Sequence, residues 1–156
     1  MTKNIFSDLK PHHLSISVPD MEQAISFWTG IFGFHLEKRA SIDALSGKVA
    51  FLEKNRFRIE LWEIKNAAPV PESRKDPNSD LRTSGTKHVA FQVPDVQAAI
   101  DELIKQGVEV ASVQRDFTEP MAHEKDPTMD LNHSRKPAVA AFIRDPFGTL
   151  IELIKA

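Results

Sequence analysis

An internal repeat is the feature that most limits what this 156-residue chain can fold into. The segment His13–Asp20 returns in recognisable form as His88–Asp95, with the Val-Pro-Asp ending preserved. The later parts of the two copies also match, since Ile59-Glu60-Leu61 corresponds to Ile151-Glu152-Leu153. A repeated unit of this length is usually one supersecondary module used twice. The sequence therefore predicts a duplicated fold.

Each copy begins with the pattern of a half-buried strand followed by a capped helix. Leu14, Ile16 and Val18 alternate with polar residues, as expected for a strand with one buried face. Asp20 then stands where it can cap a helix that carries an apolar stripe, and Gly33 is placed to end that helix. Three short strand-like runs follow, so each copy predicts a βαβββ module.

The chain divides into two modules and two irregular segments. We expect a first module at 9–66, a proline-rich linker at 67–84 and a second module at 85–156, together one domain. The second module carries an insertion at about 112–137. The expected class is α+β, with the two modules in a pseudo-twofold arrangement that forms a curved mixed sheet around a central cavity.

Composition excludes several classes of function. The chain contains no cysteine, which removes disulfides, thiolate metal sites and thiol nucleophiles. The net charge is −2 without blocks of like charge, so we expect neither nucleic acid nor a membrane surface as a partner. No apolar run is long enough to span a bilayer, and we expect a cytoplasmic protein whose partner is a small-molecule substrate.

Four ligand-type residues occupy matched positions in the two copies. His13 and His88 begin the first strands, and Glu60 and Glu152 lie inside the last strands. Alternation places both glutamates on the face opposite the one that packs against the helix. A carboxylate in such an apolar strand needs a counter-charge, a hydrogen-bond network or a metal. We therefore expect these four residues to bind one divalent metal ion.

The same residues carry a resemblance to a known superfamily. The chain resembles the vicinal oxygen chelate proteins, which include glyoxalase I, epimerases, extradiol dioxygenases and bleomycin-resistance proteins. The resemblance rests on the two His-x4-Val-Pro-Asp starts, on the Phe27-Trp28…Phe32-Gly33-Phe34 helix end, and on Asp145-Pro146-Phe147-Gly148 with the following Ile-Glu-Leu. It implies that His13, Glu60, His88 and Glu152 are the metal ligands.

The ligand set is similar to that of bacterial glyoxalase I. The resemblance implies a metal-dependent lyase or isomerase that acts through an enediolate on a small substrate with vicinal oxygens, with Glu152 and Glu60 as catalytic residues. Zn, Ni, Co, Mn and Fe remain open as the metal. Ser17, Ile64 and Ser84 stand where glyoxalase I often carries glutathione-binding residues, so the use of glutathione also remains open.

Two other functions remain as alternatives. An Fe(II) extradiol-type ring-cleavage dioxygenase shares the resemblance but uses two His and one Glu, and it commonly has a Tyr that this chain lacks. A non-enzymatic small-molecule binding or resistance protein would require all four ligand-type residues to be coincidental.

The expected substrate contacts come from the strands and from the insertion. We expect Arg58, Trp62 and Gln92 to contact substrate from the strands, and His123, His133 and Arg135 to do so from the insertion. The insertion would then cover the cavity or contact a second subunit, and we expect a homodimer.

Overall fold

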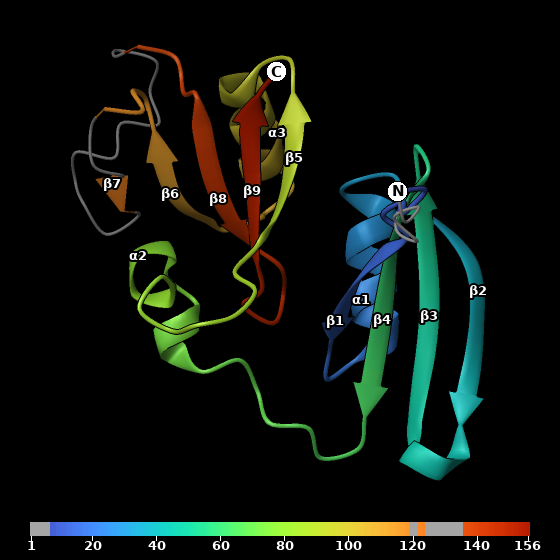
Figure 1. Ribbon diagram of the computed structural model, residues 1–156. Helices are drawn as coiled ribbons and strands as arrows, with labels where there is room; N and C mark the ends of the chain where they lie inside the picture. The colour runs from blue at the N-terminus through green and yellow to red at the C-terminus, as the bar shows by residue number, and fades with distance from the viewer. Residues whose placement is uncertain (1–6, 119–121, 124–135) are drawn as a thin grey trace, which may run out of the picture. The chain divides into compact units, whose positions relative to one another are not determined.

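The computed structural model describes residues 7–118, 122–123 and 136–156 of the chain, with only the backbone described at 122–123. The chain divides into two compact units, Met1–Ala67 and Ala68–Ala156. Each unit contains one sheet and one long helix, coloured blue to green in the first unit and green to red in the second (Figure 1). The two units are therefore described one at a time.

The first unit is a βαβββ module. Its elements are β1 (His13–Ser17), α1 (Met21–Gly30), β2 (His35–Ile42), the short 3-10 helix η1 (Asp43–Leu45), β3 (Gly47–Lys54) and β4 (Phe57–Ile64). The strands lie in the order β1-β4-β3-β2. The first and last strands, β1 and β4, are parallel and the other neighbours are antiparallel.

The second unit repeats this module and adds a short strand. Its elements are η2 (Glu72–Arg74), α2 (Pro77–Asp80), β5 (Val89–Val93), α3 (Val96–Lys105), β6 (Val110–Gln114), β7 (Ala122–His123), β8 (Ala140–Arg144) and β9 (Leu150–Lys155). The strand order is β5-β9-β8-β6-β7, with β5 parallel to β9. The prediction of two α+β βαβββ modules is confirmed, and the pseudo-twofold arrangement around a cavity stays a prediction.

Both long helices begin at the aspartates that the sequence marks. The Asp20 carboxylate accepts a hydrogen bond from the Gln23 N–H at 2.9 Å, and Asp95 accepts from the Ala98 N–H at the same distance. These bonds satisfy amide groups that have no partner inside the helix. The duplicated cap therefore fixes where each helix starts relative to the strand before it.

Strand alternation decides which side chains each sheet buries. In β4, Ile59 and Leu61 are fully buried while Glu60 between them is half-buried. Ile151 and Leu153 flank Glu152 in β9 in the same way. Burying each such aliphatic side chain stabilises the fold by about 1.5–3 kcal/mol. The cores thus hold each glutamate on the opposite face of its sheet.

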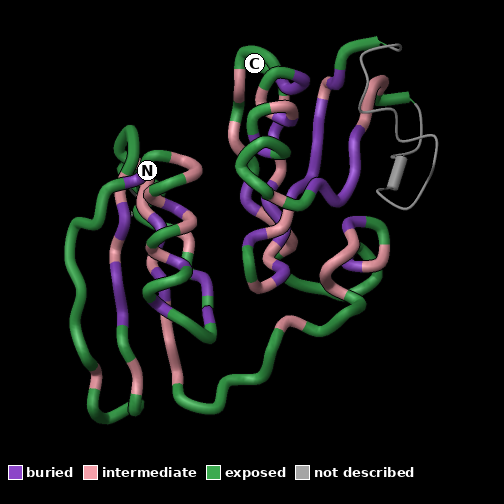
Figure 2. Tube along the Cα trace, turned by 180° about the vertical axis from the view of Figure 1, so that it is seen from behind, coloured by how far each residue is buried: buried purple, intermediate pink, exposed green. Residues whose placement is uncertain are grey.

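A β-bulge occurs at the same place in each module. The pairing of β2 with β3 shifts between Leu36 and Lys38, and the pairing of β6 with β8 shifts between Val110 and Ser112. The extra residues are Glu37 and Ala111. A bulge changes which face of the sheet the following side chain joins. Figure 2 shows that β2 is exposed along its length, whereas β6 is largely buried.

The segment expected as an exposed linker contains its own short helices. Asp80 at the end of α2 is buried and accepts hydrogen bonds from Arg74 Nε at 2.9 Å and from Lys87 Nζ at 3.3 Å. Arg144 of β8 donates to the Lys75 carbonyl at 2.7 Å. Residues 68–87 are thus joined to the second unit.

None of the helices within the described ranges is long and apolar enough to cross a membrane.

Candidate metal centre

The first unit brings one predicted histidine and one predicted glutamate together. His13 Nε2 in β1 lies 3.4 Å from Glu60 Oε2 in the adjacent strand β4. The parallel register pairs His13 with Arg58 and Ser15 with Glu60. His13 and Glu60 are therefore diagonal neighbours on one face of the sheet. The Glu60 side chain is 15% exposed and that of His13 is 34% exposed. The pair is therefore accessible from solvent on one side.

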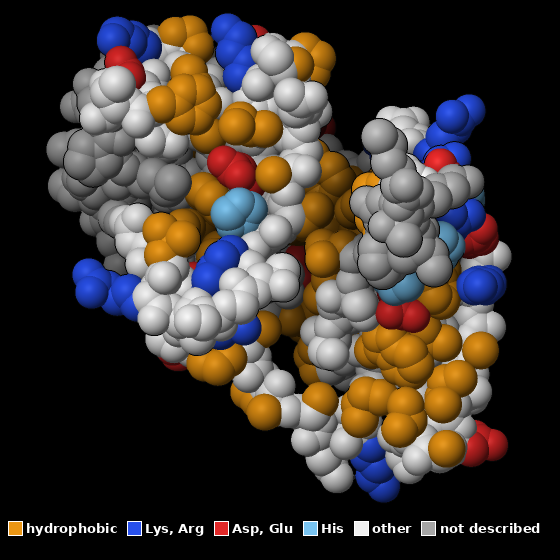
Figure 3. Space-filling view, viewed as in Figure 1, with side chains coloured by type: hydrophobic (Ala, Val, Ile, Leu, Met, Phe, Trp, Pro, Cys, Tyr) orange, Lys and Arg blue, Asp and Glu red, His pale blue; other side chains and the backbone are white. Residues whose placement is uncertain are grey.

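The second unit builds the same pair from the equivalent positions. His88, directly before β5, places its Nε2 3.0 Å from Oε2 of Glu152 in β9. The exposed fractions, 29% for His88 and 16% for Glu152, are nearly those of the first pair. Figure 3 shows histidine and acidic side chains next to each other on each unit.

An aromatic ring supports each histidine in the same way. The His13 ring packs edge-on against Phe51 with centroids 5.6 Å apart, and His88 packs edge-on against Phe142 at 4.9 Å. Phe51 is the cross-strand partner of Glu60, and Phe142 is the partner of Glu152. Each unit therefore holds a His-Glu-Phe triplet in one arrangement, with the same nitrogen facing the same oxygen.

A third His–Glu pair tests how much a short contact alone means. His35 Nε2 lies 3.2 Å from Glu53 Oε2, which is a similar distance, but the His35 side chain is 66% exposed. The matching positions in the second unit hold Glu109 and Arg144, an ordinary ion pair at 2.5 Å. The His13–Glu60 arrangement is repeated as His and Glu, whereas the His35–Glu53 arrangement is not.

The residue before each candidate ligand differs between the units. His12 Nδ1 lies 2.7 Å from His13 Nδ1, on the opposite side of the ring from Glu60. In the second unit this position is Lys87, whose Nζ donates to the Asp80 carbonyl at 2.7 Å and to the Thr83 carbonyl. His12 can therefore fix the orientation and tautomer of His13, whereas Lys87 anchors the start of β5.

The aspartate that binds Lys87 has a lowered pKa. Burial alone would raise the pKa of Asp80, but hydrogen bonds from Arg74 and Lys87 outweigh burial and hold the pKa below its ordinary value. The Asp80 side chain is 1% exposed. This charged cluster fixes the chain immediately before His88.

Around the pairs, the two units differ in charge. Arg58, predicted to contact substrate, forms two hydrogen bonds to Glu37, at 2.8 and 2.9 Å. These bonds lower the pKa of Glu37. The residues that replace Glu37 and Arg58 in the second unit are Ala111 and Leu150, which form an apolar cluster with Phe142. The guanidinium of Arg58 is thus already paired within its own unit.

The other predicted substrate contacts lie partly inside and partly outside the described residues. Trp62 lies in β4, half-buried, two residues beyond Glu60 on the same face. Gln92 is exposed in β5 and pairs in register with Ile154 of β9. His123 is in β7, where only the backbone is described, and His133 and Arg135 lie outside the described residues.

The donor set fits a divalent ion. Over the described residues, no three His, Asp or Glu side chains are grouped so that they could hold a metal ion, so each unit offers the two donors of its His–Glu pair. Two ligands about 2.1 Å from one ion lie roughly 3.0 Å apart at an octahedral angle and roughly 3.4 Å apart at a tetrahedral one. The observed separations are 3.0 and 3.4 Å. Imidazole nitrogen and carboxylate oxygen are ligands that Zn, Mn, Fe, Co and Ni accept.

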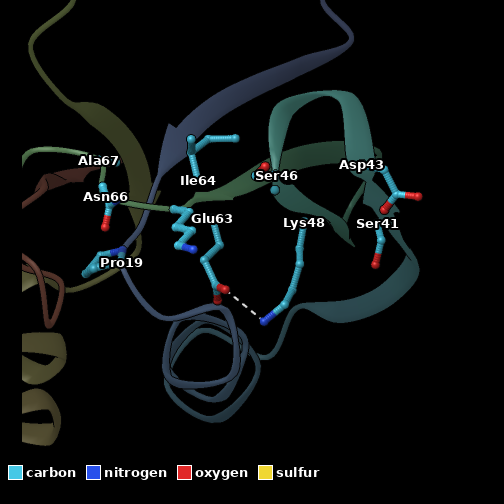
Figure 4. Close-up of a pocket in the computed structure, with 11 residues that line it drawn as sticks. Pro19, Ser41, Asp43, Ser46, Lys48, Glu63, Ile64, Asn66 and Ala67 are labelled. Atoms are coloured by element: carbon cyan, nitrogen blue, oxygen red, sulfur yellow. Dashed lines mark hydrogen bonds and ion pairs between the residues drawn. The ribbon is translucent and has the colours of Figure 1, made fainter.

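A cavity of about 450 Å³ lies elsewhere in the first unit, where β3 begins and β4 ends. Lys48 and Glu63 form an ion pair at 2.7 Å in it (Figure 4). Glu63 also accepts a hydrogen bond from the Met21 N–H. The hydrogen bond from Lys48 is the main cause of a lowered pKa at Glu63. None of the four candidate ligands lines this cavity. Its polar groups instead stabilise the start of α1.

Residues 10–153 match the family model of the Glyoxalase/Bleomycin resistance protein/Dioxygenase superfamily. The chain belongs to this superfamily, as the two modules and the duplicated His–Glu pairs indicate.

Two relatives and one solved structure illustrate the range of the similarity. The chain is 30% identical to 2-epi-5-epi-valiolone epimerase from Actinomyces sp over 131 residues, which cover 73% of this chain and 69% of the relative. It is 21% identical to human mitochondrial methylmalonyl-CoA epimerase over 160 residues, covering 100% of this chain and 79% of the relative. Leishmania major glyoxalase I has a TM-score of 0.61 at 20% identity, covering 92% and 84% of the two chains.

Proposed function

We propose that this protein is a divalent-metal-dependent lyase or isomerase of the glyoxalase I-like type. Its substrate is a small molecule with two adjacent oxygens, and the reaction moves a proton at the carbon beside a carbonyl. The observation that carries the proposal is the repetition of one His–Glu arrangement, with Nε2 facing Oε2 at 3.4 Å in one unit and 3.0 Å in the other.

The four residues would act together on one ion. His13 and Glu60 from the first unit and His88 and Glu152 from the second would hold the metal, with the two modules drawn from one chain or exchanged between two chains of a homodimer. When bound, such a metal polarises the substrate oxygens and stabilises negative charge that develops on them. Phe51 and Phe142 hold the two imidazole rings edge-on and restrict their rotation.

The carboxylates supply the proton transfer. Glu152 is the leading base, and Glu60 is a ligand or the opposing base. Both carboxylates are largely shielded by their strands but retain 16% and 15% exposure, which lets them reach a substrate. A carboxylate in each half of the site can remove a proton on one side of a carbon and return one on the other. Trp62 adds apolar surface beside Glu60 on the same strand.

Epimerisation is a second candidate reaction with the same chemistry. The two curated relatives described above are named as epimerases, one for methylmalonyl-CoA and one for 2-epi-5-epi-valiolone. An epimerase also removes and returns a proton beside a carbonyl, so the roles of Glu152 and Glu60 would be unchanged. The ring-cleavage dioxygenase and the non-enzymatic binder remain the competing proposals.

Exchange of substrate hydrogen with solvent deuterium tests the proposal. Protein reconstituted separately with Zn, Ni, Co, Mn or Fe is incubated in D2O with three probes, and deuterium beside the carbonyl is followed by NMR. The probes are the methylglyoxal hemithioacetals of glutathione and of 2-mercaptoethanol, and methylmalonyl-CoA. We expect metal-dependent exchange in at least one probe, and a loss of about 100- to 10,000-fold in Glu152→Gln.

Glu53→Gln is the matched control, because Glu53 forms the His–Glu pair that is not repeated in the second unit. We expect this variant to retain its exchange rate. Metal-dependent oxygen uptake with catechol, without exchange in the carbonyl probes, would replace the proposal with the dioxygenase. Metal uptake that is unchanged when both His13 and His88 are replaced would remove the structural basis of the proposed lyase or isomerase.

A further inference from the structure

We propose that Lys38 binds an anionic group of the substrate, and therefore that the substrate carries a carboxylate in addition to its vicinal oxygens. This inference rests on the proposed function, because it concerns the surroundings of the same His–Glu pair. Lys38 would determine which substrates bind and in which orientation, without taking part in proton transfer.

The bulge in β2 places Lys38 on the face of the sheet that carries the His13–Glu60 pair. Leu36 pairs with the buried Leu52, on the helix side, and simple alternation would put Lys38 on that side as well. The register shift between Leu36 and Lys38 instead makes Lys38 the partner of Phe51. A bulge that redirects a side chain in this way is a frequent feature beside active sites.

Lys38 is connected to the candidate ligands through one aromatic ring. Its Nζ lies 4.5 Å from the centroid of the Phe51 ring, within the range of a cation–π contact. The same ring packs edge-on against His13, and Phe51 is the cross-strand partner of Glu60. The ammonium group is thus one side chain away from the His–Glu pair. A substrate bound at the pair can reach it with a substituent.

Lys38 differs from the cations around it because its charge is not paired. Arg58 is bound by Glu37, and Arg39 is bound by Glu22 at 2.6 Å. Lys38 forms no ion pair with any residue in the described ranges, although its charge helps to lower the pKa of Glu37, and the residue is exposed. Because its neighbours are already neutralised, Lys38 is the cation beside this pair that can accept a new anionic partner at low cost in desolvation.

The equivalent position of the second unit carries no charge. The bulge of this unit places Ser112 opposite Phe142, in the position that Lys38 occupies opposite Phe51. Ser112 is fully buried. At this strand position, over the described residues, a cation therefore lies beside the first His–Glu pair and a serine beside the second. An anionic substituent would be bound on the side of the first unit, which would give the substrate a single orientation.

A matched pair of chelating probes tests this inference. 2-Oxoglutarate and 2-oxopentanoate both present the adjacent oxygens of a 2-oxo acid, but only 2-oxoglutarate has a second carboxylate. Dissociation constants are measured by calorimetry on the full-length Co(II)-loaded protein and on its Lys38→Met and Lys38→Arg variants. Arg39→Met is the control, because it removes the same charge from the neighbouring residue, whose side chain is bound to Glu22.

We expect the wild-type protein to bind 2-oxoglutarate about tenfold more tightly than 2-oxopentanoate, with this preference lost in Lys38→Met. Lys38→Arg should restore most of it, and Arg39→Met should keep it. Cobalt binding should be the same in all four proteins. Thermal unfolding shows whether each variant remains folded.

A preference that survives in Lys38→Met, or that disappears equally in Arg39→Met, would overturn the inference. So would cobalt-loaded protein that binds the two probes equally or binds neither. Each of these outcomes leaves the metal centre in place. A protein that takes up no cobalt would overturn the proposed function, and the role of Lys38 with it.

Discussion

The His–Glu pairs of the two units agree at the candidate ligands and differ at the positions next to them. Both units contain His, Glu and Phe in one arrangement, with edge-on rings and similar exposure. Beyond this shared triplet, the first unit has the ion pair Arg58–Glu37, whereas the second has the apolar contact of Leu150 with Ala111. The positions that would contact a metal thus hold the same residue types in both units, whereas the positions around them hold different ones.

This difference shows which positions of a duplicated site can change: the positions around the ligands, and not the ligands themselves. Ligand geometry tolerates little change, because donor distances and angles must suit one ion. The surrounding positions have to satisfy only local packing, by an exposed ion pair in one unit and by a buried apolar cluster in the other. The four predictions below test whether the similarity and the difference both have the proposed causes.

Loss of both histidines should have the largest effect. We expect His13→Ala combined with His88→Ala to raise the metal dissociation constant at least about a thousandfold, or about 4 kcal/mol, because it removes one ligand from each pair. Calorimetric titration measures the constant and the stoichiometry. His35→Ala is the control, since His35 forms a similar but exposed pair with Glu53. Equal affinity in the double variant and the wild type would contradict the shared site.

Exchanging side chains at one equivalent position should give unequal changes in stability. Leu150→Arg places a charge in a site that is 2% exposed, and we expect it to lower the free energy of unfolding by about 3–5 kcal/mol. The reverse change in the first unit, Arg58→Leu, should lower the melting temperature only slightly, because its ion pair with Glu37 is exposed. Urea unfolding measures the first variant and thermal unfolding the second.

Leu150→Met is the control for the second unit, since it keeps the apolar volume and should cost less than about 1.5 kcal/mol. Similar losses of stability in Leu150→Arg and Arg58→Leu would contradict the conclusion that Leu150 is in a buried apolar site and Arg58 in an exposed ion pair.

A third test addresses Asp80, which binds Lys87 directly before the second candidate histidine, whereas the equivalent position of the first unit is His12. Asp80→Asn weakens charged hydrogen bonds from Arg74 and Lys87, and we expect it to lower the free energy of unfolding at pH 7 by about 1.5–3 kcal/mol. Because the pKa of Asp80 is lowered in the folded protein, its contribution is present above the ordinary aspartate pKa of about 3.9 and is lost as the pH falls through the folded value.

The stability difference between wild type and Asp80→Asn should therefore shrink as the pH falls below about 5. Urea unfolding at a series of pH values measures it. Asp8→Asn, at an exposed position, is the control and should show a small difference throughout. A difference for Asp80→Asn that grows in acid would contradict the assigned sign.

The smallest expected effect concerns the residue before each histidine ligand. His12→Ala should lower metal affinity about tenfold, because it removes the contact at 2.7 Å to the far nitrogen of the His13 ring. Lys87→Met, at the equivalent position, should leave metal affinity nearly unchanged but reduce stability, since Lys87 bonds to Asp80 and not to His88. Equal effects of both variants on affinity, measured by calorimetry, would remove this distinction.

Most of the module architecture could be predicted from the sequence because it depends on local patterns. The aspartates that begin the helices, the alternation that buries Ile59 and Leu61, and the placement of Glu60 on the opposite face all follow from neighbours within a few residues. The match between the two copies then predicted that His13 would lie near Glu60 and His88 near Glu152, because the first and last strands pair in the same register in both units.

Other features were decided only by tertiary structure. Arg58 was predicted to contact substrate, yet it is bound by Glu37, which comes from a strand that is not its sheet neighbour. Lys38 was not singled out, because period-2 alternation places it on the wrong face and only the bulge, set by pairing with β3, redirects it. The bulge at the equivalent place in both copies is the signal that could have revealed it, once the strand register was known.

The sequence by itself thus determined the module, its faces and the candidate ligands, because each depends on short-range periodicity and on the internal repeat. The strand register, the pairing of charges and the folding of residues 68–87 onto the second unit depend on contacts between residues far apart in the chain. These contacts form only when separate elements pack together, and no local pattern specifies them.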